Sequence, residues 1–201
     1  MIVIVNYGMG NVRSVQKAFE RLGYEAQVSD SPALIERATH LVLPGVGAFA
    51  DAMHELHRRR LIEPLRRYIA SGRPFLGICL GLQLLFEASE ENGEHIGLGI
   101  LPGRVVRLQA AGLKIPHMGW NQLRILRPAP IFASLREPAW VYFVHSYYAV
   151  PTDSSVVAAE ADYPQPFAAA VWRDRIVATQ FHPEKSQRVG LTMLHDFARM
   201  A

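Results

Sequence analysis

The strongest constraint on the fold comes from the lone cysteine of the chain, Cys79, which lies between Gly77 and Gly81. Apolar residues over 75–78 indicate the end of a buried strand, and apolar spacing over 82–87 is that of a helix. A Gly-x-Cys-x-Gly run at such a junction is typical of a nucleophile elbow, where a sharp turn exposes the side chain and the glycines avoid clashes. Cys79 is therefore a candidate nucleophile. The alternative is a buried structural cysteine, a common fate of free thiols.

A basic partner for this thiol is found near the C-terminus. His182 and Glu184 follow a strand-like run over 176–180. A carboxylate behind an imidazole fixes its tautomer and stabilises its charged form, and a positive helix end or imidazole near a thiol lowers the pKa of the thiol. We expect Cys79, His182 and Glu184 to form a catalytic triad. A histidine before proline can equally be an ordinary turn or core residue.

The loop over 44–47, Pro-Gly-Val-Gly, follows another buried strand over 41–43. It can offer backbone N–H groups, and we expect the N–H of Val46 to form an oxyanion hole with the N–H of Leu80. Because glycine tolerates φ of either sign, the peptide between Gly45 and Val46 could rotate its N–H towards or away from the substrate. The alternative is a plain turn, which two glycines also permit.

Several runs together resemble a known family. Residues 77–83 and 181–184 resemble the class I (triad) glutamine amidotransferases, which release ammonia from glutamine through a γ-glutamyl thioester on cysteine. The resemblance is most specific to the glutaminase subunits of imidazole glycerol phosphate synthases, of histidine biosynthesis. It extends over essentially the whole chain, through the runs 6–11, 44–49, 116–121 and 142–148.

The resemblance implies roles for further residues. It makes Cys79 the nucleophile, His182 the acid and base, and Glu184 the residue that orients the imidazole. Expected contacts to the substrate glutamine are Gly47, Gln83, Glu91, His145, Ser146 and Tyr147. By itself, the acidic segment around Glu91 could also be a solvated loop.

The resemblance also implies a partner. Ammonia would pass to a (β/α)8-barrel cyclase subunit in a heterodimer, with no cofactor and no metal on this chain. By pattern alone, Lys114–Asn121 has neither helical nor strand periodicity and reads as a packed loop; the resemblance makes it part of the partner contact. The expected interface residues, which should be largely exposed in the isolated chain, are Asn11, Pro116, Met118, Trp120, Tyr142 and Lys185.

The remaining pattern predicts an α/β fold. We expect an open, mostly parallel sheet with antiparallel additions and helices on both faces, in one domain over 1–201. A helix face at Val12, Val15, Phe19 and Leu22 should end at Gly23, and Pro64 should lie in the first turn of a second helix after Leu61. The expected strands of the second half are 104–108, 141–144, 156–159, 168–172 and 176–180, with a final helix carrying Val189, Met193, Leu194 and Phe197.

Other functions have weaker support. Half of the 201 residues are hydrophobic, and net charge is only +3 with dispersed basic residues, so we expect no nucleic-acid partner. The first apolar run is too short for a membrane span, and a single cysteine suits a reducing compartment, so we expect a cytoplasmic protein. A dinucleotide-binding loop at Gly8-Met9-Gly10 is disfavoured, because Arg13 stands where the fingerprint needs glycine. A metal site at His54 and His57 is disfavoured, because no cysteine or carboxylate constellation completes it.

Three alternatives to a synthase subunit of this kind remain. A free-standing cysteine γ-glutamyl hydrolase would share the elbow and the triad. A glutaminase subunit of another ammonia-using synthase would share the chemistry with a different partner. A purely structural pairing protein would not need the triad that this sequence contains.

Overall fold

The computed structural model describes residues 1–109, 112–136 and 138–201. Within them, the largest sheet has eight strands in the order β2-β1-β3-β4-β14-β13-β12-β9. The first five are parallel, namely β2 (Ala26–Ser29), β1 (Ile2–Val5), β3 (His40–Gly45), β4 (Phe75–Cys79) and β14 (Ile176–Thr179). The last three join antiparallel, namely β13 (Pro166–Arg173), β12 (Val157–Asp162) and β9 (Arg124–Ile125). The predicted fold class is confirmed.

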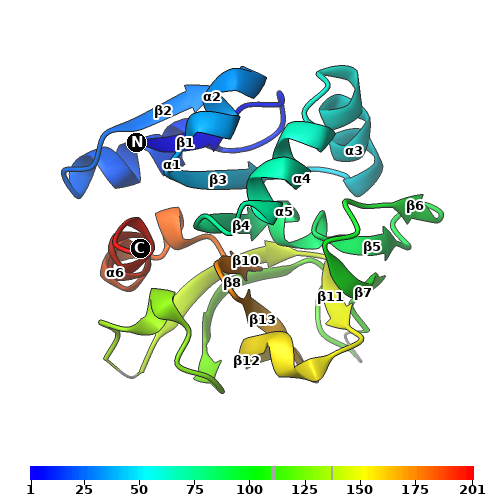
Figure 1. Cartoon of the computed structure of the whole chain (residues 1–201). Coiled ribbons are helices and arrows are strands. Elements are labelled where there is room, and N and C mark those ends of the chain that lie inside the picture. Colours follow the sequence, from blue (N-terminus) through cyan, green and yellow to red (C-terminus); the bar gives the residue numbers. More distant parts are fainter. Residues whose placement is uncertain (110–111, 137) are drawn as a thin grey trace.

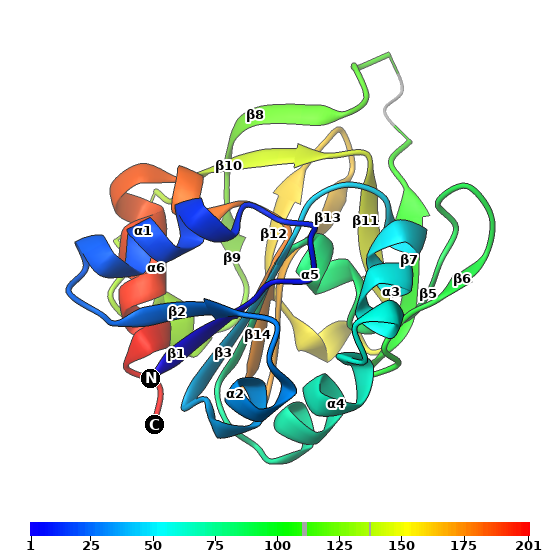
Figure 2. The same cartoon turned by 90° about the horizontal axis from the view of Figure 1, so that it is seen from above.

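Helices cover both faces of the parallel part (Figure 1, Figure 2). On one face, α1 (Val12–Arg21) and α6 (Gln187–Ala198) pack in a core cluster with Ile2, Ile4 and Leu76. On the other, α2 (Pro32–Arg37), α3 (Phe49–Arg58) and α4 (Ile62–Ala70) pack in a second cluster with Val3, Val5 and Leu43. Alternate residues of one strand thus serve opposite cores, as expected for a strand buried on both faces.

The helix ends follow the predicted signals. Leu22 lies just beyond α1, and Gly23 adopts a φ of +83°, a left-handed conformation that stops the helix. Pro64 lies in the first turn of α4, where its missing N–H breaks no helical hydrogen bond.

Two smaller sheets complete the fold. One pairs β10 (Trp140–His145) with β8 (His117–Gln122), which run together at one end of the molecule (Figure 2). The other has the order β11 (Tyr147–Pro151), β7 (Leu101–Arg107), β5 (Phe86–Ser89) and β6 (His95–Ile96). Short 3-10 turns lie at Pro130–Phe132, Ser154–Val156 and Pro183–Lys185.

Two local predictions are wrong. The segment Lys114–Asn121, predicted as a loop, is largely strand. The strand was missed because its apolar Met118 and Trp120 are exposed while the polar His117 is buried, which is the reverse of the usual alternation. The helix after Cys79, α5 (Leu80–Gln83), has only one turn, and Phe86 already belongs to β5. A buried apolar run has no polar face, so its period cannot separate helix from strand.

Candidate active site

Cys79 occupies a strained turn at the end of β4. Its φ of 55° and ψ of −108° are unusual for a residue with a side chain, and such strain is concentrated at functional sites. The turn depends on close backbone contact, because a Cβ on Gly81 would lie 1.8 Å from the carbonyl oxygen of Leu43 and one on Gly77 2.8 Å from the oxygen of Gly81. The predicted elbow is confirmed, but a helix of one turn adds little dipole to activate the thiol.

A cavity of about 290 Å³ opens beside Cys79. It brings together elements far apart in the chain: the loop after β3, the elbow, the acidic segment after β5 and the junction of β10 with β11. Lining it are all the predicted oxyanion and substrate contacts, namely Val46, Gly47, Leu80, Gln83, Glu91, His145, Ser146 and Tyr147, together with Pro116 and Val144.

His182 and Glu184 form a buried pair. Nδ1 of His182 lies 2.8 Å from Oε1 of Glu184, and the two side chains are 2% and 1% exposed. Nε2 of His182 has no hydrogen-bond partner at normal distance and angle among the described residues. The Cys79 thiol nevertheless lies close enough to raise the pKa of His182. Burial lowers the pKa of His182, but hydrogen bonding and charge from Cys79 and Glu184 outweigh burial and raise the pKa to about 10. The raised pKa favours the imidazolium form of His182 beside the Cys79 sulfur.

The turn that carries this pair is fixed to strand β10. The backbone N–H of His182 donates to the carbonyl of Tyr142 at 2.9 Å. The Ser186 hydroxyl donates to the carbonyl of His182 at 2.6 Å and accepts from the N–H of Tyr142 at 3.0 Å. Sequence reasoning did not assign a role to Ser186, although it lies two residues beyond Glu184.

Gln180 is a second residue that the sequence analysis did not place in the site. It is fully buried at the end of β14, and its Nε2 lies 3.7 Å from the sulfur of Cys79. Its Oε1 accepts from Nε2 of Gln83 at 3.1 Å, and the same Gln83 amide donates to the carbonyl of Tyr147 at 2.9 Å. The position of Gln180, at the end of a buried strand and just before the Phe-His-Pro-Glu run, was the available sequence signal for a role in the site, because a buried side-chain amide needs hydrogen-bond partners.

The family described as Glutamine amidotransferase class-I matches this chain over residues 3–201. The chain belongs to the class-I glutamine amidotransferase family. It is 63% identical to "Imidazole glycerol phosphate synthase subunit HisH" of Syntrophotalea carbinolica, over 100% of both chains. It is 54% identical to the protein of the same name from Geobacter sulfurreducens, over 99% of this chain and 98% of that one.

Solved structures agree on the fold of this amidotransferase. A "glutamine amidotransferase" crystal structure superposes with a TM-score of 0.77 at 21% identity, covering 98% of this chain and 100% of that chain. PurLQS from Thermotoga maritima gives 0.79 at 17% identity, covering 98% and 96%. At these identities the likeness concerns the fold alone.

Glu91 has a structural contact within the amidotransferase. Its Oε2 accepts a hydrogen bond of 2.8 Å from the backbone N–H of Phe49, at the start of α3. The carboxylate thereby satisfies a free N–H at a helix N-terminus. It also lines the Cys79 cavity, so one oxygen is held while the side chain stays within the site.

The predicted interface residues differ in exposure. Pro116, Met118, Trp120 and Lys185 are exposed, whereas Asn11 and Tyr142 are half-buried. Asn11 accepts from the hydroxyl of Ser14 at 2.8 Å, and the rings of Trp120 and Tyr142 are 6.1 Å apart. The expectation of exposure is thus met by four of these residues and only partly by the other two.

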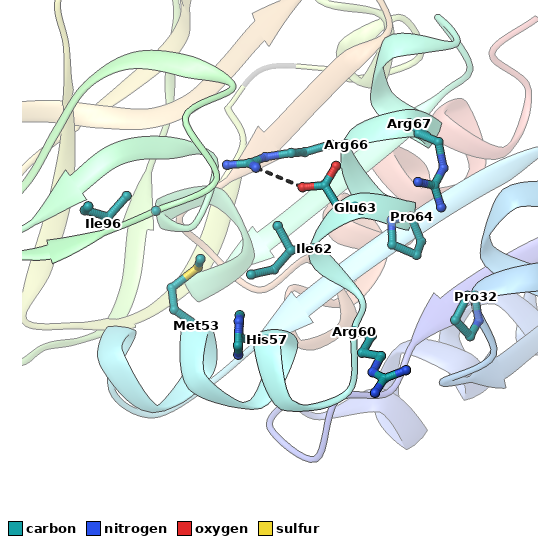
Figure 3. Close-up of a pocket in the computed structure, with 11 residues that line it drawn as sticks. Pro32, Met53, His57, Arg60, Ile62, Glu63, Pro64, Arg66, Arg67 and Ile96 are labelled. Atoms are coloured by element: carbon teal, nitrogen blue, oxygen red, sulfur yellow. Dashed lines mark hydrogen bonds and ion pairs between the residues drawn. The ribbon is translucent and has the colours of Figure 1, made fainter.

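A larger hollow, of about 750 Å³, lies elsewhere on the amidotransferase, between α3, α4 and β6 (Figure 3). It shares no lining residue with the Cys79 cavity, and its Arg66 is paired with Glu63 at 3.1 Å. His57 lines this hollow but belongs to no metal site, because the described residues contain no cluster of three or more metal-binding side chains.

No helix in the described ranges has the length and apolar character needed to cross a membrane.

Proposed function

We propose that this amidotransferase is the glutaminase subunit of an imidazole glycerol phosphate synthase, acting in histidine biosynthesis as one domain over 1–201. The observation that carries the proposal is the strained Cys79 turn at a cavity, with the Cys79 sulfur close to an imidazole, that of His182, which Glu184 holds through Nδ1. Full-length relatives named as subunits of that synthase support the assignment.

In the proposed reaction, the Cys79 thiolate attacks the side-chain amide carbon of glutamine. His182, as imidazolium, gives its proton to the leaving nitrogen, so that ammonia departs and a γ-glutamyl thioester remains. His182 is then neutral and takes a proton from water, which attacks the thioester and releases glutamate. Glu184 holds the imidazole through Nδ1 and stabilises its charge in both steps.

The tetrahedral intermediates carry an oxyanion. We assign its stabilisation to the backbone N–H groups of Leu80, directly after the nucleophile, and of Val46, in the loop after β3 that lines the same cavity. Gly47, Gln83, Glu91 and the segment His145–Ser146–Tyr147 would hold the rest of the substrate glutamine, because all of them line the same cavity.

The partner is proposed to be a (β/α)8-barrel cyclase subunit, bound as a heterodimer over the face that includes Met118 and Trp120. Pro116 supports this arrangement, because it lines the Cys79 cavity and stands just before the exposed strand β8. Ammonia released there could enter a partner without crossing bulk water, where it would be protonated. The reaction uses no cofactor or metal on this chain, and a reducing cytoplasm suits the lone thiol.

The test is the complex with the cyclase, assayed with glutamine and separately with ammonium. Cys79→Ala should abolish glutamine-dependent synthesis and glutamine hydrolysis, while ammonium-dependent synthesis stays near the wild-type rate. Loss of both activities would contradict the division of labour. Full glutamine hydrolysis by the isolated wild-type chain would instead favour a free-standing hydrolase, and stimulation only by a different synthase would favour another partner.

A further inference from the structure

His117 and His145 face each other across the small sheet at the edge of the active site. They are register partners at the end of the β8–β10 pair, and both are buried. Nδ1 of His117 lies 3.0 Å from Nε2 of His145. Nδ1 of His145 lies 2.9 Å from the carbonyl oxygen of Tyr147, and Nε2 of His117 lies 3.4 Å from the amide nitrogen of Asn121.

The direction of every hydrogen bond in this series is fixed by its ends. The carbonyl of Tyr147 can only accept, so Nδ1 of His145 must carry the proton. Nε2 of a neutral His145 is then an acceptor, which requires the proton of His117 on Nδ1. Nε2 of His117 is left to accept from the amide of Asn121. Two neutral Nδ1–H imidazoles satisfy all three contacts.

The series continues to the nucleophile. The Tyr147 carbonyl accepts from His145 and also from the side-chain amide of Gln83. The same Gln83 amide donates to Oε1 of Gln180. Nε2 of Gln180 in turn lies 3.7 Å from the Cys79 sulfur. The neighbouring carbonyl of Val144 lies 3.9 Å from the same sulfur. Asn121 and His117 belong to β8, whose other face carries the exposed Met118 and Trp120.

We propose that His117 and His145 are positioning residues, which together form an uncharged hydrogen-bonded link that holds the β10–β11 junction, Gln83 and Gln180 in register with Cys79 and joins them to strand β8. Neither imidazole transfers a proton in the reaction. The link lets a displacement of β8 change the placement of Cys79 directly.

The surroundings keep the two imidazoles neutral. His117 stacks on Tyr163 and Phe143, with ring centroids 4.1 and 4.8 Å apart, and Phe167 contacts both histidines. Burial lowers the pKa of His117 to about 4 and that of His145 to about 3, the latter also under the influence of His117 and His182. Among the described residues, the titratable groups that face the pair are Tyr163 and His182.

The tautomers give a direct test on the isolated wild-type chain. Long-range ¹H–¹⁵N correlation spectra of histidine-labelled protein should show two neutral Nδ1–H rings, which disappear in His117→Asn and His145→Asn as each is assigned. Both should stay neutral at pH 6, about half a unit below the ordinary histidine pKa. An Nε2–H tautomer or a protonated ring at either position overturns the proposal.

Kinetics test the positioning role, and this part rests on the proposed function. In the complex, His117→Leu should lower kcat with glutamine about tenfold or more, because nucleophile placement is lost. His117→Asn, which keeps an N–H where Nδ1 stood, should recover most of kcat. Equal losses in both variants overturn the proposal.

A matched control separates positioning from packing. Phe167→Leu removes apolar contact with both histidines and no hydrogen bond, so it should lower the melting temperature while leaving kcat unchanged. Alkylation of the lone Cys79 by iodoacetamide provides a readout that needs no glutaminase activity. It should slow in His117→Leu and keep the wild-type rate in Phe167→Leu; wild-type alkylation and kcat in His117→Leu would refute the link even if the proposed function fails.

Discussion

On one side of Cys79, the turn with His182 and Glu184 is buried, and hydrogen bonds to Tyr142 and Ser186 hold its backbone. On the other side, the loop after β3 is exposed: Val46 retains 39% of its accessible surface, and Gly47 adopts a φ of +100°. The proposed acid–base half of the site is thus built in advance, whereas the proposed oxyanion half is an open, glycine-containing loop.

This difference indicates where activity can be controlled. A buried ion pair with fixed partners resists displacement, because breaking it leaves charges without compensation. Reorienting one exposed peptide requires far less free energy than breaking such a pair. The loss of one oxyanion donor nevertheless costs about 3–4 kcal/mol of transition-state stabilisation. We therefore expect partner binding to act on the loop and to leave the turn unchanged.

The largest effects should come from the turn. His182→Ala removes the proton donor and acceptor and should lower kcat of the complex by roughly 10³-fold or more. Glu184→Gln keeps a hydrogen-bonding group at Nδ1 and should retain more turnover, because Glu184 positions and exchanges no proton. Steady-state glutamine hydrolysis measures both, with ammonium-dependent synthesis as the control that must not change. Equal losses in the two variants would contradict the separate roles.

Gly45→Ala should come next. Gly45 does not have a positive φ here, so the reason for glycine is packing: an added Cβ would lie 2.5 Å from the Tyr7 hydroxyl and 2.8 Å from Cβ of Leu80, the other residue proposed for the oxyanion hole. Turnover in the complex should fall roughly 10²-fold, the usual loss of one oxyanion donor, with KM nearly unchanged. Ammonium-dependent synthesis, which should not change, controls for damage to the fold or to the complex. Wild-type turnover in Gly45→Ala would remove this loop from the oxyanion hole.

The sequence was informative where local chemistry dictates structure. Gly77 and Gly81 predicted the elbow, and His182 with Glu184 predicted the buried pair. It failed where burial comes from long-range pairing: His117 is buried because β8 pairs with β10, and Gln180 lies beside Cys79 because β14 joins β4 across about 100 positions. No local period reports such contacts.

The ion pair in the turn should show in the pH dependence of stability. Contacts with Cys79 and Glu184 outweigh burial and raise the pKa of His182 in the folded state from its ordinary value near 6.5 to about 10, so these contacts stabilise the fold fully below pH 6.5. That contribution is lost as pH rises towards 10, on the order of 5 kcal/mol in total. Urea unfolding from pH 6.5 to 10 measures it, and Glu184→Gln should flatten the slope. An identical slope in both proteins would mean that Glu184 does not contribute to the raised pKa of His182.

Trp120 tests whether the partner approaches over β8. Its side chain is 45% exposed next to Tyr142, as suits an aromatic anchor awaiting a partner. Trp120→Ala should weaken binding of the cyclase by about 2 kcal/mol, measured by calorimetric titration. Leu126, 47% exposed outside the proposed face, is the control, and its replacement by alanine should leave affinity unchanged. Equal affinity in both variants would exclude Trp120 from the interface.

The smallest expected effect concerns Tyr7, which lies under the loop. Its hydroxyl is buried next to Gly45 and has no hydrogen-bond partner among the described residues, and burial together with the nearby Cys79 raises the pKa of the phenol. An unsatisfied buried hydroxyl costs stability, so Tyr7→Phe should raise the free energy of unfolding by about 1 kcal/mol. Tyr68→Phe is the matched control: its hydroxyl donates to Pro74 at 2.9 Å, and its loss should destabilise by a similar amount. If the loop uses the Tyr7 hydroxyl when the Gly45–Val46 peptide reorients, Tyr7→Phe should also lower turnover in the complex while stabilising the free chain. Destabilisation by Tyr7→Phe would mean that the hydroxyl is already bonded, and that the loop is as fixed as the turn opposite it.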